Sequence, residues 1–160
     1  RHPSVALRPR NAQPRRGGAG NAGRRRALAG WVLARAAEER KGFALAEFSI
    51  ALVDDAGITP LNEQFMRHKG ATDVISFRLA PPPGQALPAG EIVINVQRAL
   101  EEAKRRRGDA SMELAWYLAH GIDHLAGATD KTAAQRAAMH KREKSWLRAA
   151  GPLAANLIRA

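Results

Sequence analysis

The feature that most constrains the fold of this chain is a pair of histidines followed by a glycine and an acid. In order they are His120, His124, Gly127 and Asp130. Histidines four residues apart lie about 40° apart around a helix axis, so both imidazoles can reach one ion. A straight helix would carry Asp130 off that face, but Gly127 allows the helix to stop and the chain to turn back. The spacing therefore predicts three ligands of one metal ion, His120, His124 and Asp130, with a fourth position open as in catalytic zinc sites.

Composition limits what kind of metal site and what kind of partner are possible. The chain has 160 residues, no cysteine, and 26 Lys and Arg residues against 15 Asp and Glu, a net charge of +11. Without cysteine there are no disulfides or thiolate ligands, so a metal site must use histidine and carboxylate. The charge favours a polyanionic partner such as RNA, and a solvated, arginine-rich surface is an equal alternative. No apolar run approaches the length of a membrane span, so we expect no membrane partner.

Basic residues are concentrated near the beginning of the chain. No acidic residue precedes Glu38, and Ser4 is the only serine in that stretch. A targeting peptide would also be rich in arginine and poor in acids, but it would be rich in serine. We therefore expect a cytoplasmic protein of bacterial type with a flexible basic loop over residues 13–23.

The hydrophobic pattern predicts strands and helices in a mixed order. Strands are expected at residues 5–8, 48–52, 72–77 and 91–96, and the last is nearly all apolar and therefore central. Helices are expected at about residues 25–40, after Asp54 or Asp55, at about 97–107, from Ser111, and from Thr132 to a stop at Gly151. The prediction is an α+β fold: a small mixed sheet of about four strands with helices packed on it, and the metal site on a central helix and the following turn. Residues 1–150 form a single domain in this interpretation, and residues 151–160 form a loose tail.

Five motifs follow one another in this chain across residues 5–149. They are Leu61-Asn62-x-x-Phe65, Thr-Asp-Val-Ile-Ser-Phe at 72–77, Gly-Glu-Ile-Val-Ile at 90–94, the histidine segment at 113–130, and Met139-x-x-x-Glu143. In order and spacing they resemble the YbeY family, bacterial rRNA maturation factors regarded as zinc-dependent, single-strand-specific endoribonucleases. The resemblance implies one Zn²⁺ per chain on His120, His124 and Asp130, with these residues acting through metal-bound water. It also implies single-stranded rRNA and the small ribosomal subunit as partners, with roles at the 3′ end of 16S rRNA and in ribosome quality control. No DNA partner is expected.

Several positions depart from the family pattern around the site. The third ligand is usually histidine in the family, and Asp130 is an ordinary zinc ligand in its place. The family's preceding aspartate is Thr129 here, and its leucine between the histidines is Asp123, which we expect to face solvent. An arginine that follows the aromatic residue of the first motif is replaced by Met66.

Two further residues are expected to bind substrate. Arg67, or else His68, is placed to supply the cation that Met66 lacks. The neighbours of Ser76 in its strand, Ile75 and Phe77, should point to the other face of the sheet. Ser76 can therefore face a cleft beside the metal, as the family resemblance implies. By contrast, Trp116 is expected in the core rather than as a platform for a base.

Two alternatives remain open from the sequence. One is a non-catalytic, zinc-containing ribosome-assembly or RNA-binding factor. The other is a metal-dependent hydrolase of another substrate such as a peptide. Gly121 stands where an HExxH metallopeptidase has its general-base glutamate, and this argues against the peptide alternative.

Overall fold

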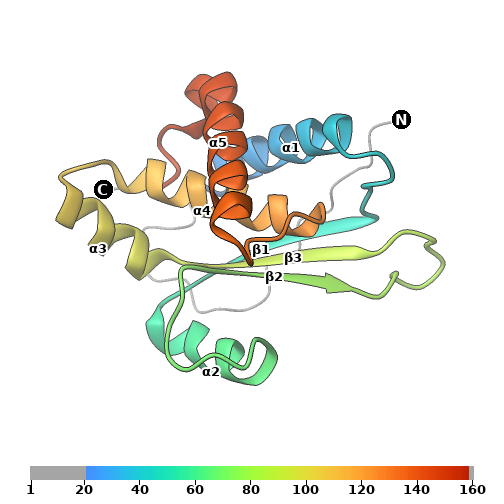
Figure 1. Cartoon of the computed structure of the whole chain (residues 1–160), viewed down its shortest axis with the longest axis horizontal. Helices are drawn as coiled ribbons and strands as arrows, with labels where there is room; N and C mark the ends of the chain where they lie inside the picture. The colour runs from blue at the N-terminus through green and yellow to red at the C-terminus, as the bar shows by residue number, and fades with distance from the viewer. Residues whose placement is uncertain (1–20, 159–160) are drawn as a thin grey trace.

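The computed structural model describes residues 21–158, and Figure 1 shows their arrangement. The elements in chain order are α1 (Ala22–Glu39), β1 (Glu47–Val53), α2 (Asp55–Phe65), β2 (Val74–Leu79), β3 (Ala89–Asn95), α3 (Val96–Arg106), α4 (Ala110–Leu125), α5 (Ala133–Ala150) and a 3₁₀ turn, Gly151–Ala154. The expected α+β class and the order of these helices and strands are confirmed. No helix in the described part of the chain is long and apolar enough to cross a membrane.

The sheet is mixed, as predicted, and β3 is its central strand. β1 pairs with β3 in parallel and β2 pairs with β3 antiparallel, so that Ile50 and Ser76 flank Ile92 on either side. All residues of β3 except Glu91 are buried, which is why its sequence is nearly continuous in apolar residues. The described residues form three strands rather than the expected four, and the fourth predicted strand, residues 5–8, lies outside them.

The two faces of the sheet carry different layers. Ile92 and Ile94 belong to the main core with α1, α4 and α5, while Val93, between them, joins Ile75 and Ile58 in a smaller cluster beneath α2. This follows from the alternation of side chains along a strand. Figure 1 shows α2 on one side of the sheet and the other helices on the opposite side.

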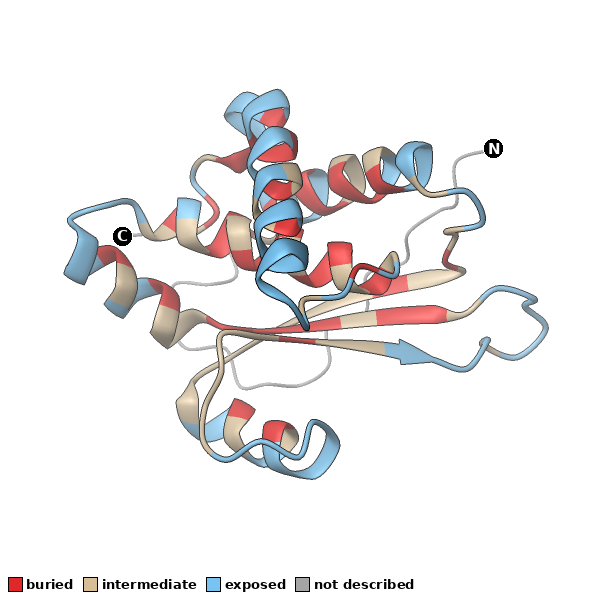
Figure 2. Ribbon diagram, in the orientation of Figure 1, coloured by how far each residue is buried: buried red, intermediate tan, exposed pale blue. Residues whose placement is uncertain are grey.

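Helix α4 is the central helix of the larger layer. It contacts both β2 and β3 as well as α1, α3 and α5. Its predicted apolar stripe, Leu114, Leu118, Ile122 and Leu125, is buried along its whole length. Burial concentrates on β3 and α4 in Figure 2, whereas α5 exposes one side. The predicted metal ligands His120 and His124 therefore lie on a helix that is buried along its length.

The start of α4 and the end of the chain correct two sequence-based predictions. Asp109, not Ser111, is the N-cap: its carboxylate accepts the backbone N–H of Ser111. The hydroxyl of Ser111 is buried instead and accepts backbone N–H groups of Leu157 and Ile158. Since Leu157 is fully buried, the described part of the tail packs on the helices and is not loose.

The beginning of α1 corrects the position of the predicted basic loop. α1 starts at Ala22, so residues 21–23 do not belong to a loop, and residues 13–20 lie outside the described structure. Asn21 and Arg25 donate hydrogen bonds to the backbone carbonyls of Asn156 and Leu157. Contacts with the distant end of the chain thus hold the helix start in place, and no local sequence signal reports them.

Candidate metal centre

The turn after α4 has the geometry that the glycine predicts. Gly127 has a φ of 106°, its N–H bonds the carbonyl of His124, and the N–H of Ala128 bonds the carbonyl of Asp123. This pair of hydrogen bonds is the Schellman motif, which ends a helix at a left-handed glycine and reverses the chain. The reversal returns Asp130 to the helix face that carries His120 and His124, which confirms the role expected for Gly127.

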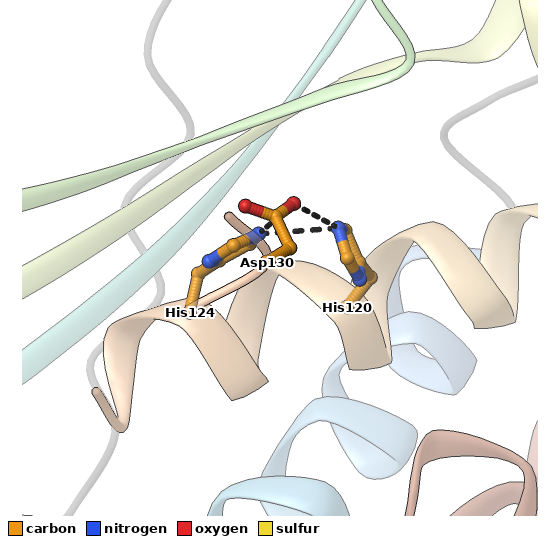
Figure 3. A group of neighbouring side chains, drawn as sticks. All are labelled: His120, His124 and Asp130. Carbon is orange, nitrogen blue, oxygen red and sulfur yellow. Dashed lines mark hydrogen bonds and ion pairs between the residues drawn. The ribbon is translucent and has the colours of Figure 1, made fainter. Parts of the chain in front are cut away.

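The three predicted ligands converge in the structure (Figure 3). Nε2 of His124 lies 3.2 Å from Nε2 of His120 and 3.3 Å from Oδ2 of Asp130, while His120 Nε2 and the same oxygen are 4.0 Å apart. Donor atoms about 2.0–2.2 Å from a tetrahedral zinc ion would be about 3.3–3.6 Å apart. Two of the three separations match these edges closely, and the Asp130 side chain is 45% exposed and free to adjust. The donor set therefore fits a small divalent ion without rearrangement of the helix.

Hydrogen bonds on the outer side of each ring fix which nitrogen faces the centre. Nδ1 of His124 bonds the carbonyl oxygen of Ala128 at 3.0 Å, and Nδ1 of His120 bonds Oε1 of Glu143 at 2.9 Å. A carbonyl or carboxylate can only accept, so each Nδ1 carries a proton, and in the neutral form of the ring this makes the inward Nε2 the lone-pair nitrogen. Two lone pairs and a carboxylate oxygen facing one point repel one another unless a cation lies between them.

Glu143 holds its position through several contacts at once. Its side chain is 1% exposed and also accepts the indole N–H of Trp116 at 3.2 Å. Burial raises the pKa of Glu143, and the bond to His120 opposes that effect. Burial lowers the pKa of His120, but the hydrogen bond and charge of Glu143, together with the charges of Asp73 and Asp130, outweigh it, and the net shift is upward. Glu143 therefore increases the basicity of the ligand that it orients.

A cavity of about 270 Å³ opens beside this centre. Its walls include the ligands His120 and Asp130, and also Asp73, Trp116 and Arg136. Trp116 packs against the core, as predicted, but it is only half-buried. Its exposed part lines the cavity, and its ring contacts that of His140 edge-on. The sequence reasoning did not identify Asp73, Arg136 or His140, because their proximity arises from the packing of β2 and α5 against α4.

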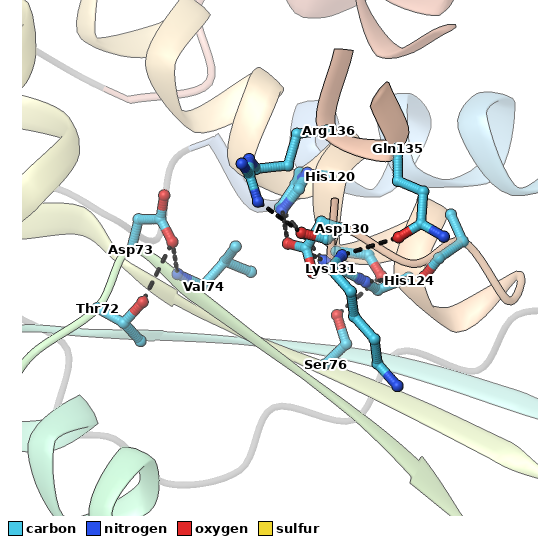
Figure 4. A network of polar contacts seen from close by, with 12 residues as sticks. Thr72, Asp73, Val74, Ser76, His120, His124, Asp130, Lys131, Gln135 and Arg136 are labelled. Atoms are coloured by element: carbon cyan, nitrogen blue, oxygen red, sulfur yellow. Dashed lines mark hydrogen bonds and ion pairs between the residues drawn. The ribbon is translucent and has the colours of Figure 1, made fainter. Parts of the chain in front are cut away.

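Ser76 and Gly121 join α4 to the sheet. Ser76 points from β2 toward α4 (Figure 4) and donates its hydroxyl hydrogen to the carbonyl of Gly121 at 2.8 Å. A Cβ atom at Gly121 would lie 2.9 Å from Cδ1 and 3.0 Å from Cγ2 of Ile92. Any side chain at this position would push against Ile92 and the Ser76 hydroxyl, so a glutamate as in HExxH would require the contact between α4 and the sheet to open.

Two other predicted positions lie differently from what the sequence suggested. Asp123 does not face solvent: it is fully buried, and its Oδ1 accepts from Nε of Arg142 at 2.9 Å. Asp123 lies on a side of α4 that packs against α5, and Arg142 of α5 supplies the charge that makes an acid tolerable there. Arg67 follows α2 on the other side of the sheet, is exposed, and does not line the cavity. The arginine that does line it is Arg136.

Comparison with known proteins gives a consistent result. A family model described as Endoribonuclease YbeY matches residues 21–151. The chain is 40% identical over 116 residues to an Endoribonuclease YbeY of Anaeromyxobacter sp. (strain Fw109-5), which covers 72% of this chain and 60% of that protein. It is 37% identical to an Endoribonuclease YbeY of Moorella thermoacetica, covering 66% of this chain and 74% of the relative.

The fold is also similar to a solved structure. The solution structure of TM1509 from Thermotoga maritima matches with a TM-score of 0.52 and 24% identity, over 81% of this chain and 83% of that one. This similarity concerns the fold alone. The chain spans only 58–60% of the length of the two Anaeromyxobacter relatives.

Proposed function

Because the chain belongs to the Endoribonuclease YbeY family, we propose that it is a zinc-dependent endoribonuclease that cleaves single-stranded RNA. Its place would be in rRNA maturation at the 3′ end of 16S rRNA and in quality control of the small ribosomal subunit, in the cytoplasm. The observation that carries the proposal is the convergence of two histidine Nε2 atoms and a carboxylate oxygen within 4.8 Å of one another beside an open cavity. The net charge of +11 suits a polyanionic substrate.

His120, His124 and Asp130 would hold the ion. A zinc ion in such a site supplies Lewis acidity to a phosphate and lowers the pKa of water. Glu143 and the carbonyl of Ala128 keep the histidine protons on the outer nitrogens, and so keep both inner nitrogens available. These residues therefore serve to bind the ion and to orient the two histidine rings toward it.

Two further side chains in the cavity are placed to act on substrate. Asp73 accepts the N–H of Val74 through Oδ1, so Oδ2 remains available to take a proton from the attacking water. Arg136 donates Nη1 to the backbone carbonyl of Asp130 at 3.2 Å, and its remaining N–H groups can neutralise a phosphate at the ion. In this proposal Ser76 acts mainly by positioning α4, and Arg67 would contact RNA only where the strand crosses to the other side of the sheet.

The proposal is tested by RNA cleavage with zinc content measured in the same samples. The zinc-loaded protein should cut a single-stranded RNA and leave a duplex of the same sequence intact. Chelation should abolish the cleavage and added Zn²⁺ should restore it, while His124→Ala should neither retain zinc nor cleave. If the zinc-loaded wild-type protein binds the RNA without cutting it, the chain is a non-catalytic RNA-binding factor and the proposal is wrong.

A further inference from the structure

A second, open cavity lies beside the loop that carries Asp130. Its volume is about 230 Å³, which leaves room for a group larger than one water molecule. Thr129 lines this cavity and its neighbour Asp130 lines the first one, so the two cavities adjoin the same short loop. Arg40, Gln135 and Arg142 form other parts of its wall.

The polar groups around this second cavity are hydrogen-bond donors. The guanidinium of Arg40 has no ion pair or hydrogen bond with any side chain among the described residues, and its Nη1 would be 3.7 Å from a Cβ atom at Gly127. Oε1 of Gln135 already accepts the N–H groups of Lys131 and Thr132, which leaves its amide N–H₂ to donate. Among the residues that line the cavity there is no Asp or Glu within the described part of the chain.

The charge of this cavity is fixed by the packing beneath it. Arg142 is held by its bond to Asp123, a carboxylate that is fully buried and therefore does not line the cavity. Arg40 has no such partner among the described residues, so the wall carries two guanidinium groups, of which one is paired. A phosphodiester carries one negative charge and accepts hydrogen bonds only, so charge and donor pattern both match it.

We propose that this second cavity binds a phosphate group. Resting on the proposed function, the phosphate belongs to the backbone of the RNA strand that the metal centre would cleave. Binding there would anchor the strand on both sides of the loop between Gly127 and Asp130, and would contribute position rather than sequence recognition. The same donors would suit free inorganic phosphate, so the test must distinguish the two sources.

The first experiment uses inorganic phosphate and needs no RNA. Phosphate is titrated into the ¹⁵N-labelled, zinc-loaded full chain while the amide signals of Gly127, Ala128 and Thr129 are followed. We expect saturable shifts in the wild type and in the control Lys41→Gln, which removes an exposed charge one residue away, and their loss in Arg40→Gln. If wild type shows no shift, or if Arg40→Gln shifts as wild type does, the proposal is overturned. The same spectra show whether each variant is folded.

The second experiment assigns the source of the phosphate. Affinity for a 2′-O-methylated single-stranded RNA of about a dozen nucleotides is measured against salt concentration. Arg40→Gln should bind about tenfold more weakly and reduce the slope of log affinity against log salt by about 0.7, the value for one phosphate contact on a single strand. Lys41→Gln should change neither. If Arg40→Gln loses the phosphate shifts but keeps its RNA affinity and slope, the site takes free phosphate and the RNA assignment is refuted. Neither readout requires cleavage, so a failure of the proposed nuclease activity is seen separately.

Discussion

Replacing Gly121 with alanine tests how closely α4, the helix of the proposed metal ligands, is fitted to the sheet. The added methyl group would lie 2.9–3.0 Å from Ile92, which is fully buried, and 3.2 Å from the hydroxyl of Ser76. Overpacking of this kind costs about 1–3 kcal/mol. The same substitution removes the backbone entropy of glycine, which favours a helix by about 1 kcal/mol. We therefore expect Gly121→Ala to be destabilised by roughly 0–2 kcal/mol, with α4 displaced from β3 and zinc bound more weakly.

Gly30→Ala is the matched control, because Gly30 lies within α1 and a Cβ atom there would have no neighbour within 4 Å. It should stabilise the protein by up to about 1 kcal/mol. The difference between the two variants cancels the helix propensity and isolates the packing effect, about 1–3 kcal/mol or roughly 2–12 °C in Tm. Urea unfolding followed by circular dichroism measures it. Equal stability of the two variants would show that α4 does not pack on Ile92 as described.

Three other changes probe the groups around the proposed ligands. Glu143→Gln should weaken zinc binding about 10–100-fold by competition titration. Because burial lowers and Glu143 raises the pKa of His120, that pKa should be lower in the metal-free variant than in the metal-free wild type when both are titrated by NMR, and an unchanged pKa would contradict the assignment. Arg142→Met leaves the buried Asp123 unpaired and should lower the free energy of unfolding by about 3–5 kcal/mol, measured by urea unfolding. The double variant Arg142→Met/Asp123→Leu should recover most of that loss. If it does not, the loss in the single variant does not come from the broken ion pair. Asp73→Asn should lower kcat for RNA cleavage about 100-fold with zinc content unchanged, and full activity would exclude Asp73 as the proton acceptor.

The sequence predicted those parts of the fold that depend on local pattern. The alternation of β3, the apolar stripe of α4 and the glycine turn at Gly127 are all encoded within a few residues, and each prediction was confirmed. The capping box of α5 is another case, since Thr132 and Gln135 bond each other's backbone as expected.

The predictions that failed depend on contacts between distant segments. Asp123 was expected in solvent because an acid is costly in a core, and only its pairing with Arg142, 19 residues away, makes burial acceptable. Ser111 was expected to cap α4, but its hydroxyl accepts a hydrogen bond from the backbone N–H of Leu157 near the end of the chain instead. The role of Glu143 in orienting His120 was likewise not foreseen, because it requires α5 to cross α4 at that position.

The central claim is that His120, His124 and Asp130 together hold one divalent ion, and a zinc competition titration tests it most directly. Wild type should bind one Zn²⁺ per chain, and so should Glu101→Ala, which removes an exposed carboxylate on α3. Alanine at any one of the three ligand positions should sharply weaken binding. Undiminished affinity in His120→Ala or His124→Ala would contradict the metal centre, and undiminished affinity in Asp130→Ala would remove the aspartate from the ligand set.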